Sequence, residues 1–558
     1  MRARLSWAHA GPNGEESKCE PCNGRENMKR SRIQYSVRGR RLTRLLLAPA
    51  LAVVVLLQGC TDLEESPTSV ITPENFFRTE QEVLGSLASV YGRLRETQWG
   101  YYNLSSITAD EQIVPTRGSD WFDNGRWLEI HRQTWTPTST SALDDMNGTW
   151  NVLFEGIARA NVLLAALEDL TVPDQATIVA ELRTLRAFYY FMLMDLFGGV
   201  PIVDNTELIA RPKNTRAEVF QFIDTELNAA RADLPASWPA DQNGRMTQGA
   251  ADVILADMYL NAAVFQTDAP SATSYNSCTT VQIGTQTACE AAIAVADRVL
   301  NSGQYSLASE GNWRSNFEAD NSSSLENILV VKNTNEAGAN LGLNLVMRVL
   351  HYEQFNPTPW NGFAALAETY NAFDADDERR EIFLQGPQTN FDTGDPVCER
   401  PGCAQGGTPL SFTVDIIDET QAGEAEGTRI VKFSPDPNHT AEHNGNDFVY
   451  FRLADIWMIK AEAELEQGVG DPLGILNTLR ARVFEPDEPL TSVDRDVILQ
   501  ERLFEFTGEA KRRRDLIRHG KFTDPWSFKP QTEAFRVLMP IPQPQLDANP
   551  ELTQNPGY

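Results

Sequence analysis

Long amphipathic helices joined by short connections are the feature that most restricts the fold of this chain. Apolar residues recur at helical spacing in four consecutive segments, at residues 150–170, 178–197, 216–233 and 247–265. Such spacing is expected of helices that bury one face. The second segment ends at Gly198-Gly199 with Pro201 beyond, which is the usual C-terminal punctuation of a helix. Pairs of such helices predict helical-repeat packing, although no clean period of about 34 residues is present.

The rest of the chain predicts more helices, two long loop regions and little strand. Further helices are expected from Pro73 to Leu94 and at residues 289–301, 451–466, 473–483 and 496–519. Residues 97–149 and 385–447 are rich in turn formers and lack a sustained period, so we expect loops there. Asn327 to Val331 is the clearest candidate strand. The expected fold is therefore mainly α with minor β elements, and a helical scaffold that presents long loops suits binding.

The N-terminal region carries a secretion signal. An apolar run at residues 45–59 follows a cluster of arginines and ends in Gly59, directly before Cys60. It resembles a bacterial lipoprotein signal, which makes Cys60 the lipidated first residue of the mature chain, followed by an acidic tether at residues 60–72. The alternative, a signal anchor, is disfavoured because the run is short for a bilayer span. A conventional signal would begin at Met28, so residues 1–27 are interpreted as lying upstream of the true start codon. Cleavage before Cys60 would remove the signal, and residues 1–59 are therefore expected to be absent from the mature protein.

The cysteines fall into close pairs. Cys278 with Cys289, and Cys398 with Cys403, each lie in a segment rich in Gly, Ser, Thr or Pro. An even number of cysteines in loops outside the cytoplasm predicts two local disulfides. A zinc site is the alternative, but it would need two distant loops to converge tetrahedrally. Cys19-x-x-Cys22 lacks the strand–helix context of a redox motif.

The charge excludes several classes of partner. The chain has a formal net charge of −29, and residues 1–59 hold more basic than acidic side chains, so the mature part is more acidic still. A field of this sign disfavours nucleic acid, anionic lipid and polyanionic ligands. The basic run Lys511 to Arg514 is therefore predicted to form intramolecular salt bridges.

Five sequence blocks carry a family resemblance. They include Leu196-Phe-Gly-Gly-Val-Pro-Ile-Val203 and Leu538-Met-Pro-Ile-Pro-Gln543, and they lie at residues 181–203, 244–260, 451–463, 501–509 and 538–558. In this order they resemble the SusD/RagB family from about residue 62 to the end. The resemblance implies a tetratricopeptide-like helical scaffold, with an N-terminal region at 73–270 and a C-terminal region at 271–558 packed as one body.

The same resemblance implies the protein's role. Members of the family are outer-membrane lipoproteins on the cell surface that act as the lid of a SusC-like TonB-dependent transporter. They capture oligosaccharides, and some capture peptides, without cleaving them and without a cofactor. The acidic stretch Asp62-Leu-Glu-Glu65 is similar to the surface-export signal of such lipoproteins. Two alternatives remain. The protein could be a purely structural lid of the transporter that does not itself bind the ligand, or it could be a surface hydrolase.

Aromatic residues beside planar polar ones indicate where a sugar would bind. Residues 110–135 hold three tryptophans among such groups, and Arg117, Asp120 and Trp121 are the candidates there. Trp360 with Asn361, and Trp313, are further candidates, and Trp99, Tyr101 and Tyr102 form a related group. Any of these rings could instead pack a loop onto the helices. Trp127 and Trp135 are predicted to do so.

The motifs give little support to catalysis. His439-Thr-Ala-Glu-His443 matches a zinc-peptidase pattern, which needs a helix to place both imidazoles on one face. Pro435 and Pro437 before it and Asn444-Gly445 after it oppose a helix, so we expect no metal site. Pairs of acids suited to a glycosidase are unavoidable in a chain with 77 Asp and Glu and identify nothing. The chain is predicted not to be an enzyme.

Overall fold

The computed structural model describes residues 79–268, 277–485 and 487–558. The predicted signal, Cys60 and the acidic tether lie outside these residues, as does the start of the helix predicted from Pro73. No helix within the described ranges is long and apolar enough to cross a bilayer.

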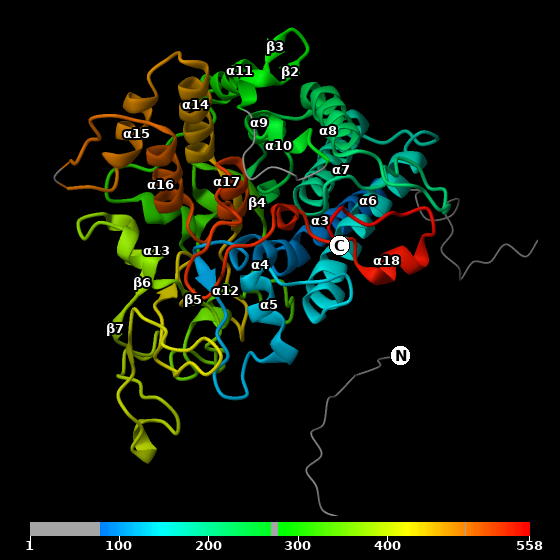
Figure 1. Cartoon of the computed structure of the whole chain (residues 1–558). Coiled ribbons are helices and arrows are strands. Elements are labelled where there is room, and N and C mark those ends of the chain that lie inside the picture. The colour runs from blue at the N-terminus through cyan, green and yellow to red at the C-terminus, as the bar shows by residue number, and fades with distance from the viewer. Residues whose placement is uncertain (1–78, 269–276, 486) are drawn as a thin grey trace, which may run out of the picture. The chain divides into compact units, whose positions relative to one another are not determined.

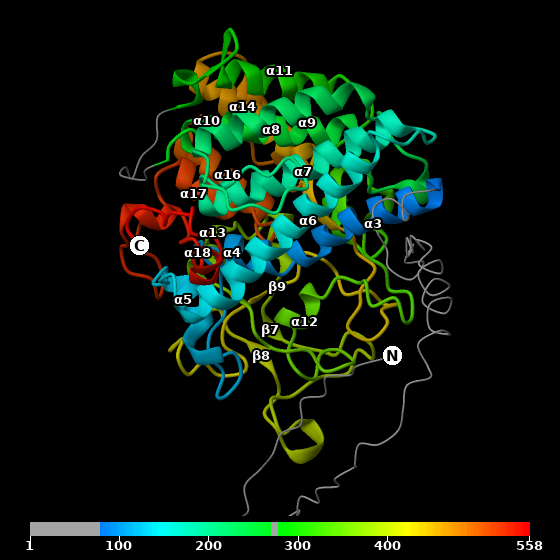
Figure 2. The ribbon, with the colours of Figure 1, turned by 90° about the vertical axis from the view of Figure 1, so that its right-hand side faces the viewer.

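The first half of the described chain is a row of long helices. They are α3 (Glu80–Thr97), α6 (Asn147–Ala166), α7 (Gln175–Phe197), α8 (Arg216–Ala230) and α9 (Gln248–Leu260). Each packs against the next along the row, as Figure 2 shows. Capping boxes start α3 at Thr79 and α8 at Thr215, where each threonine hydroxyl accepts a hydrogen bond from the third residue of its helix.

Helix α7 lies at the centre of this row. Every residue from Thr184 to Phe197 is buried, because neighbours cover it on all sides. Close approach to α6 depends on Gly156, where an added Cβ would lie 2.5 Å from the ring of Tyr189. A helix buried all round needs no polar face, which explains its nearly continuous apolar sequence.

The row continues in the C-terminal half. Here lie α11 (Ala288–Leu300), α14 (Leu453–Gln467), α15 (Pro472–Arg480), α16 (Arg495–Phe506) and α17 (Arg512–Arg518). Helix α11 packs against both α9 and α14, so helices from the two sides of residue 270 are in contact (Figure 1). The division into regions at 270 stays a prediction.

The expectation of one helix over residues 496–519 is wrong. Gly508 has a φ of +81° and Ala510 a φ of +59°, so the chain turns between α16 and α17. This turn directs Glu509 and Lys511 into the interior, where both are buried. The salt bridges predicted for the basic run are confirmed, since Lys511, Arg512 and Arg513 pair with Asp455, Asp110 and Asp195 at 2.6–3.0 Å.

Strand content is small. The predicted strand is confirmed as β4 (Asn327–Val331), which pairs antiparallel with β10 (Phe448–Arg452). The other strands are two-residue pairs: β1 (Gln112–Ile113) with β5 (Ala364–Ala365), β2 (Gln282–Ile283) with β3 (Gln286–Thr287), β6 (Phe383–Leu384) with β9 (Arg429–Ile430), and β7 (Gly386–Pro387) with β8 (Ser411–Phe412). The prediction of a mainly helical fold with minor β elements is confirmed.

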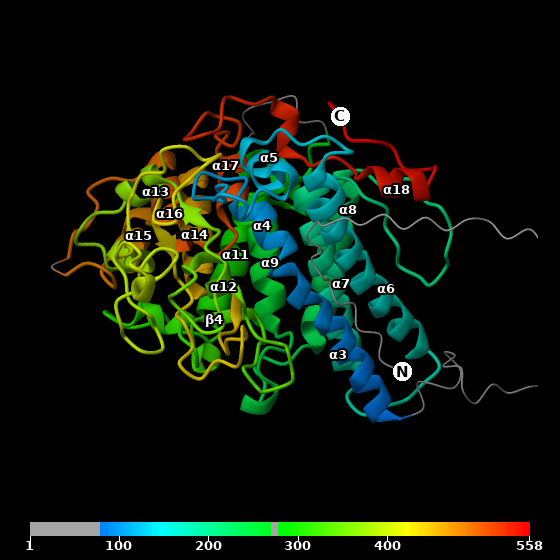
Figure 3. The same cartoon turned by 90° about the horizontal axis from the view of Figure 1, so that it is seen from below.

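Short helices accompany the long ones. They are α4 (Gly100–Ser106), α5 (Arg126–Arg132), α10 (Ala262–Phe265), α12 (Leu345–Val349), α13 (Ala367–Ala372) and α18 (Gln543–Ala548). Of these, α4 and α5 lie in the region 97–149 that we expected to be a loop. Figure 3 shows α4, α5 and α12 among the loops beside the helical row. Residues 97–149 are therefore partly helical, because tertiary burial stabilises short helices that have no pronounced period of their own.

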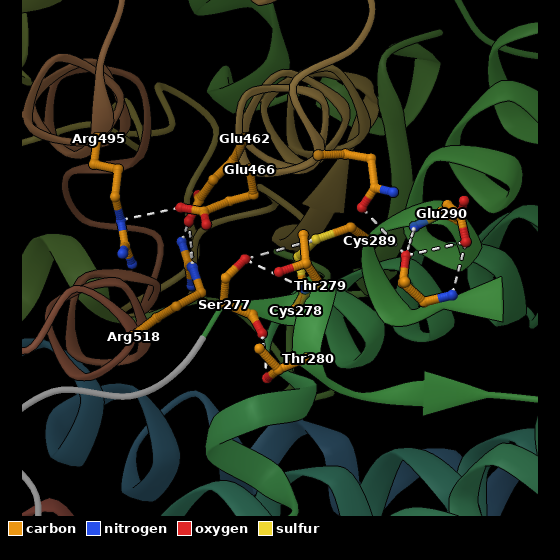
Figure 4. The surroundings of a disulfide bond; sticks show 12 residues. Ser277, Cys278, Thr279, Thr280, Cys289, Glu290, Glu462, Glu466, Arg495 and Arg518 are labelled. Carbon is orange, nitrogen blue, oxygen red and sulfur yellow. Dashed lines mark hydrogen bonds and ion pairs between the residues drawn. A yellow bond between two sulfur atoms is a disulfide. The ribbon is translucent and has the colours of Figure 1, made fainter.

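The four cysteines form two disulfides, Cys278–Cys289 and Cys398–Cys403. The first joins a turn to the start of α11, close to the ion pairs Glu462–Arg518 and Glu466–Arg495 (Figure 4). The second closes a short loop that carries Arg400.

Charged side chains also form part of the interior. A buried ion cluster brings together residues from β10, α16 and several connecting segments: Glu326, Asp377, Arg379, Lys432, Arg452, Arg482, Glu501, Glu505 and Glu509. At its centre Glu505 lies 2.7 Å from both Arg452 and Arg482 and 3.2 Å from Arg379.

Candidate ligand-binding site

Three tryptophans from distant segments meet at the surface. Trp99 directly precedes α4, Trp121 follows β1, and Trp360 follows α12. The ring of Trp360 lies 6.3 Å from that of Trp99 and 6.5 Å from that of Trp121, measured between centroids. All three side chains are partly exposed. We call these residues the tryptophan cluster.

Buried aromatic residues support the cluster from below. Trp127 and Phe363 contact the ring of Trp121 at 5.3 and 5.5 Å and contact each other at 5.6 Å. Trp127 and Trp135 are almost completely buried, which agrees with the packing role predicted for both. Phe363 was not predicted, because an isolated phenylalanine beside a turn carries no signal of its own.

The backbone fixes the orientation of Trp121. Its φ is +61°, and its indole Nε1 donates a hydrogen bond of 2.6 Å to the carbonyl oxygen of Trp360. The indole also lies against Gly362, where an added Cβ would be 2.3 Å from ring atom Cε2. Glycine at 362 is therefore required for the ring to lie where it does.

Gly362→Ala is accordingly expected to displace Trp121 while the chain stays folded. The indole must move, because an approach of 2.3 Å is not tolerated between carbon atoms. If Trp121 contacts ligand, affinity for that ligand falls by about tenfold, equivalent to about 1.4 kcal/mol. Calorimetric titration and tryptophan fluorescence measure the two effects. Gly423→Ala, whose Cβ would meet nothing closer than 3.3 Å, is the matched control. An unchanged fluorescence spectrum in Gly362→Ala would contradict the prediction.

Arg348 joins the segments that carry Trp99 and Trp360. Its guanidinium lies 4.4 Å from the ring of Trp99 and donates to the carbonyl oxygen of Gln98 at 2.9 Å. Its own carbonyl oxygen accepts hydrogen bonds from the amides of Gly362 and Phe363. Burial lowers the pKa of Arg348 to about 9, so the group stays protonated at neutral pH. Nothing in the sequence marks this arginine.

A polar rim flanks the cluster. It consists of Asp120, Tyr352, Arg400 and Glu424. The hydroxyl of Tyr352 donates to Asp120 at 2.6 Å, and Arg400 lies 3.4 Å from Asp120 while also pairing with Glu424. Burial, followed by the hydrogen bond to Asp120, raises the pKa of Tyr352. Arg400, in the loop closed by Cys398–Cys403, is exposed and lies 4.1 Å above the ring of Tyr352.

Two of the predicted ligand residues, Arg117 and Asn361, are buried instead of facing solvent. Arg117 donates to the carbonyl oxygens of Gly423 and Glu426, and burial lowers its pKa to about 10. Asn361 donates to the carbonyl oxygen of Glu424, and its own side-chain oxygen accepts from Arg429. These side chains hold the loops of the site in place.

Trp313 packs away from the tryptophan cluster. It is 3% exposed, and its ring contacts Phe317 and lies 5.8 Å from the ammonium of Lys432 in the buried ion cluster. Tyr101 and Tyr102 are buried as well. Their sequence context resembled that of the exposed tryptophans, but core positions have the same composition.

A cavity of about 280 Å³ opens beside Trp99. Arg126, Asp144 and Asp145 line it, together with Glu96 and the start of α6. Arg126 lies 2.7 Å from Asp145 and 4.4 Å from the ring of Trp127. Burial raises the pKa of Asp145 to about 7 although Arg126 opposes the shift. An aromatic side chain beside carboxylates and a guanidinium suits a polyhydroxylated ligand.

The peptidase-like motif forms a turn. Ala441 has a φ of +52°, and Thr440 and His443 pair through their backbones, so the two histidines do not share a helix face. His439 contacts Asp392 at 3.2 Å. Within the described ranges no group of histidine, cysteine and acidic side chains is arranged to hold a metal ion.

Family models match both halves of the chain. One described as "SusD family" matches residues 413–558, and one described as "Starch-binding associating with outer membrane" matches residues 63–260. The chain is a SusD/RagB family protein. The Starch-binding protein SusD of Bacteroides thetaiotaomicron is 26% identical over 523 residues, which are 83% of this chain and 87% of that protein.

Solved structures share the SusD-like fold. A laminarin-binding SusD-like protein is 23% identical with a TM-score of 0.67, covering 86% of this chain and all of its own. Surface glycan-binding protein A from Bacteroides thetaiotaomicron, in complex with laminarihexaose, is 22% identical with a TM-score of 0.66, covering 85% of this chain and 99% of its own. These names describe binding and not catalysis, in agreement with the prediction that this SusD-like chain is not an enzyme.

Proposed function

We propose that this protein is a cell-surface glycan-binding lipoprotein that holds a neutral oligosaccharide on the tryptophan cluster. The observation that carries the proposal is the convergence of three partly exposed indoles from three distant segments, next to a polar rim. Indole faces stack on the apolar C–H faces of sugars, while carboxylates and guanidinium groups bond to their hydroxyls. Relatives named for starch and laminarin support glucans as the first ligands to test.

The same proposal includes the setting of the protein. Cys60 would carry the acyl chains that anchor it to the outer membrane, because a lipid anchor needs no spanning helix. A SusC-like TonB-dependent transporter would then receive the oligosaccharide, with this chain as its lid. The family model described as associating with the outer membrane supports the location at the outer membrane.

Alanine substitution in the cluster tests ligand binding directly. We expect wild-type protein to bind laminarihexaose or maltohexaose in a calorimetric titration. Trp121→Ala and Trp360→Ala each weaken binding by about ten- to a hundredfold, as truncation of a central tryptophan does in other interfaces. Trp238→Ala, a partly exposed tryptophan outside the cluster, is the control. Equal affinities in the wild type and all three variants would show that the tryptophan cluster does not contact the ligand. If the wild type binds none of the glycans tested, the alternative of a lid that binds no ligand is favoured.

A further inference from the structure

A second hollow lies away from the tryptophan cluster. It has a volume of about 500 Å³ and runs between α3, the end of β4 and residues 243–245. Its wall is mainly apolar: Leu84, Leu87, Ala88, Leu94, Val330 and Val331. Residues 84, 87, 88 and 91 have the spacing of a single helix face. We call this hollow the α3 groove.

One cation in the α3 groove forms no ion pair among the described residues. The guanidinium of Arg95 donates to the carbonyl oxygen of Lys332 at 3.0 Å, and the neighbouring Glu96 acts on it electrostatically without reaching ion-pair distance. The buried Nε of Arg95 has no hydrogen-bond partner among the described residues either. The other two cations of the groove are paired, Arg245 with Glu181 and Lys332 with Asp447. In a chain of net charge −29, an arginine that forms no ion pair among the described residues and keeps a free Nε–H can bind an external anion.

We propose that the α3 groove binds an amphipathic carboxylate of the medium-chain fatty-acid class. The carboxylate pairs with Arg95, and the alkyl chain lies along the apolar face of α3 toward Leu84. These two residues are eleven positions apart, which is about 16 Å along a helix axis and suits an extended alkyl chain such as that of dodecanoate. Burial of the chain supplies affinity, and the guanidinium selects the charged headgroup. This site is separate from the proposed glycan site.

Filling the groove is the sharpest test, because two glycines of α3 form a matched pair. Gly92 lines the groove and Gly85 does not, and an added Cβ meets nothing within 4 Å at either position. Gly92→Phe and Gly85→Phe are both expected to fold, since each removes a glycine from a helix interior. Calorimetric titration with dodecanoate below its micelle concentration is expected to detect binding to the wild type and to Gly85→Phe. Gly92→Phe is expected to weaken binding at least tenfold.

A second comparison tests the headgroup. Arg95→Met keeps an apolar stem of similar length and removes the charge. We expect it to weaken dodecanoate binding about tenfold while leaving the weaker binding of neutral dodecan-1-ol unchanged. Laminarihexaose titrations of the same variants should match the wild type, so failure of the glycan proposal and failure of this one are distinguishable.

Three results would overturn the proposal. The first is wild-type protein that does not bind dodecanoate, as expected if a protein segment covers the groove. The second is equal affinity in Gly92→Phe and Gly85→Phe, which would place the fatty acid elsewhere. The third is an equal loss of dodecanoate and dodecan-1-ol binding in Arg95→Met, which would leave an apolar groove without a carboxylate site.

Discussion

Glu505→Gln is expected to lower the free energy of unfolding by about 3–5 kcal/mol, the cost of breaking a buried ion pair from one side. The carboxylate of Glu505 holds Arg452, Arg482 and Arg379, and all four side chains are at most 6% exposed. Neutralising it removes the carboxylate that these three buried guanidinium groups share, although each keeps another acidic partner in the cluster. Urea denaturation at pH 7, monitored by circular dichroism, measures the change.

A surface pair provides the control. Glu155 pairs with Arg159 one turn away on α6, and both side chains are substantially exposed. Glu155→Gln is expected to cost less than about 1 kcal/mol, since solvent screens exposed pairs. Equal destabilisation by Glu155→Gln and Glu505→Gln would contradict the prediction and show that the buried ion cluster tolerates loss of charge.

The pH dependence of Glu505 has a definite sign. Burial alone would raise the pKa of this carboxyl, but Arg482, Arg452 and Arg379 together hold it well below its usual range. A depressed pKa contributes stability above the unfolded value of about 4.3, and this contribution is lost as the pH falls through the folded value. Wild-type protein should therefore lose stability below about pH 4 more steeply than Glu505→Gln does.

Local signals in the sequence predicted the elements that depend on local physics. The period of residues 178–197 and the glycines that follow it define α7, and residues 327–331 form a strand as expected. The cysteines pair with their nearest neighbours in the chain. In each case the decisive interaction joins residues close in sequence.

Long-range partners explain what the sequence left undetermined. Residues 496–519 were expected to form one helix, whereas partners from β10 and from the segments near residues 379 and 482 bury several of the charged side chains in this stretch. Gly508 breaks the helix for the same reason, because Glu509 must turn inward to reach Arg452 and Lys432. No local pattern encodes those contacts.

The ligand-binding role of the candidate residues stays a prediction, but the structure shows which of them lie together. Tryptophan density and turn residues drew attention to Trp121 and Trp360, which the fold brings together. Composition could not distinguish these partly exposed rings from the buried Trp313. Arg348 and Arg400 escaped prediction because their roles depend on neighbours about 245 and 280 positions away, at Asn103 and Asp120.

Glu111→Gln is expected to stabilise the protein at pH 8 by about 2–3 kcal/mol. Glu111 is 1% exposed, accepts hydrogen bonds from Ser106 and from the amide of Gly508, and has no ion pair among the described residues. Burial raises its pKa from 4.5 to about 7. A raised pKa contributes stability below the unfolded value, and this contribution is lost as the pH rises through the folded value. Above pH 7 the fold therefore contains a buried carboxylate at a cost of about 1.4 kcal/mol per pKa unit.

The pH dependence of the stability difference between Glu111→Gln and the wild type tests the protonation of Glu111 more directly than the size of that difference at one pH. The stability advantage of Glu111→Gln should grow between about pH 5 and pH 7 and level off above, because glutamine has no proton to lose. Glu336→Gln, at an exposed loop position, should differ from the wild type by a constant amount. The pKa of Asp145 is also raised to about 7, so the variant should keep part of the wild-type slope in this window. A constant difference between Glu111→Gln and the wild type would mean that Glu111 is already ionised in the fold at pH 5. The Ser106 hydroxyl and the Gly508 amide would then be sufficient to hold a buried carboxylate.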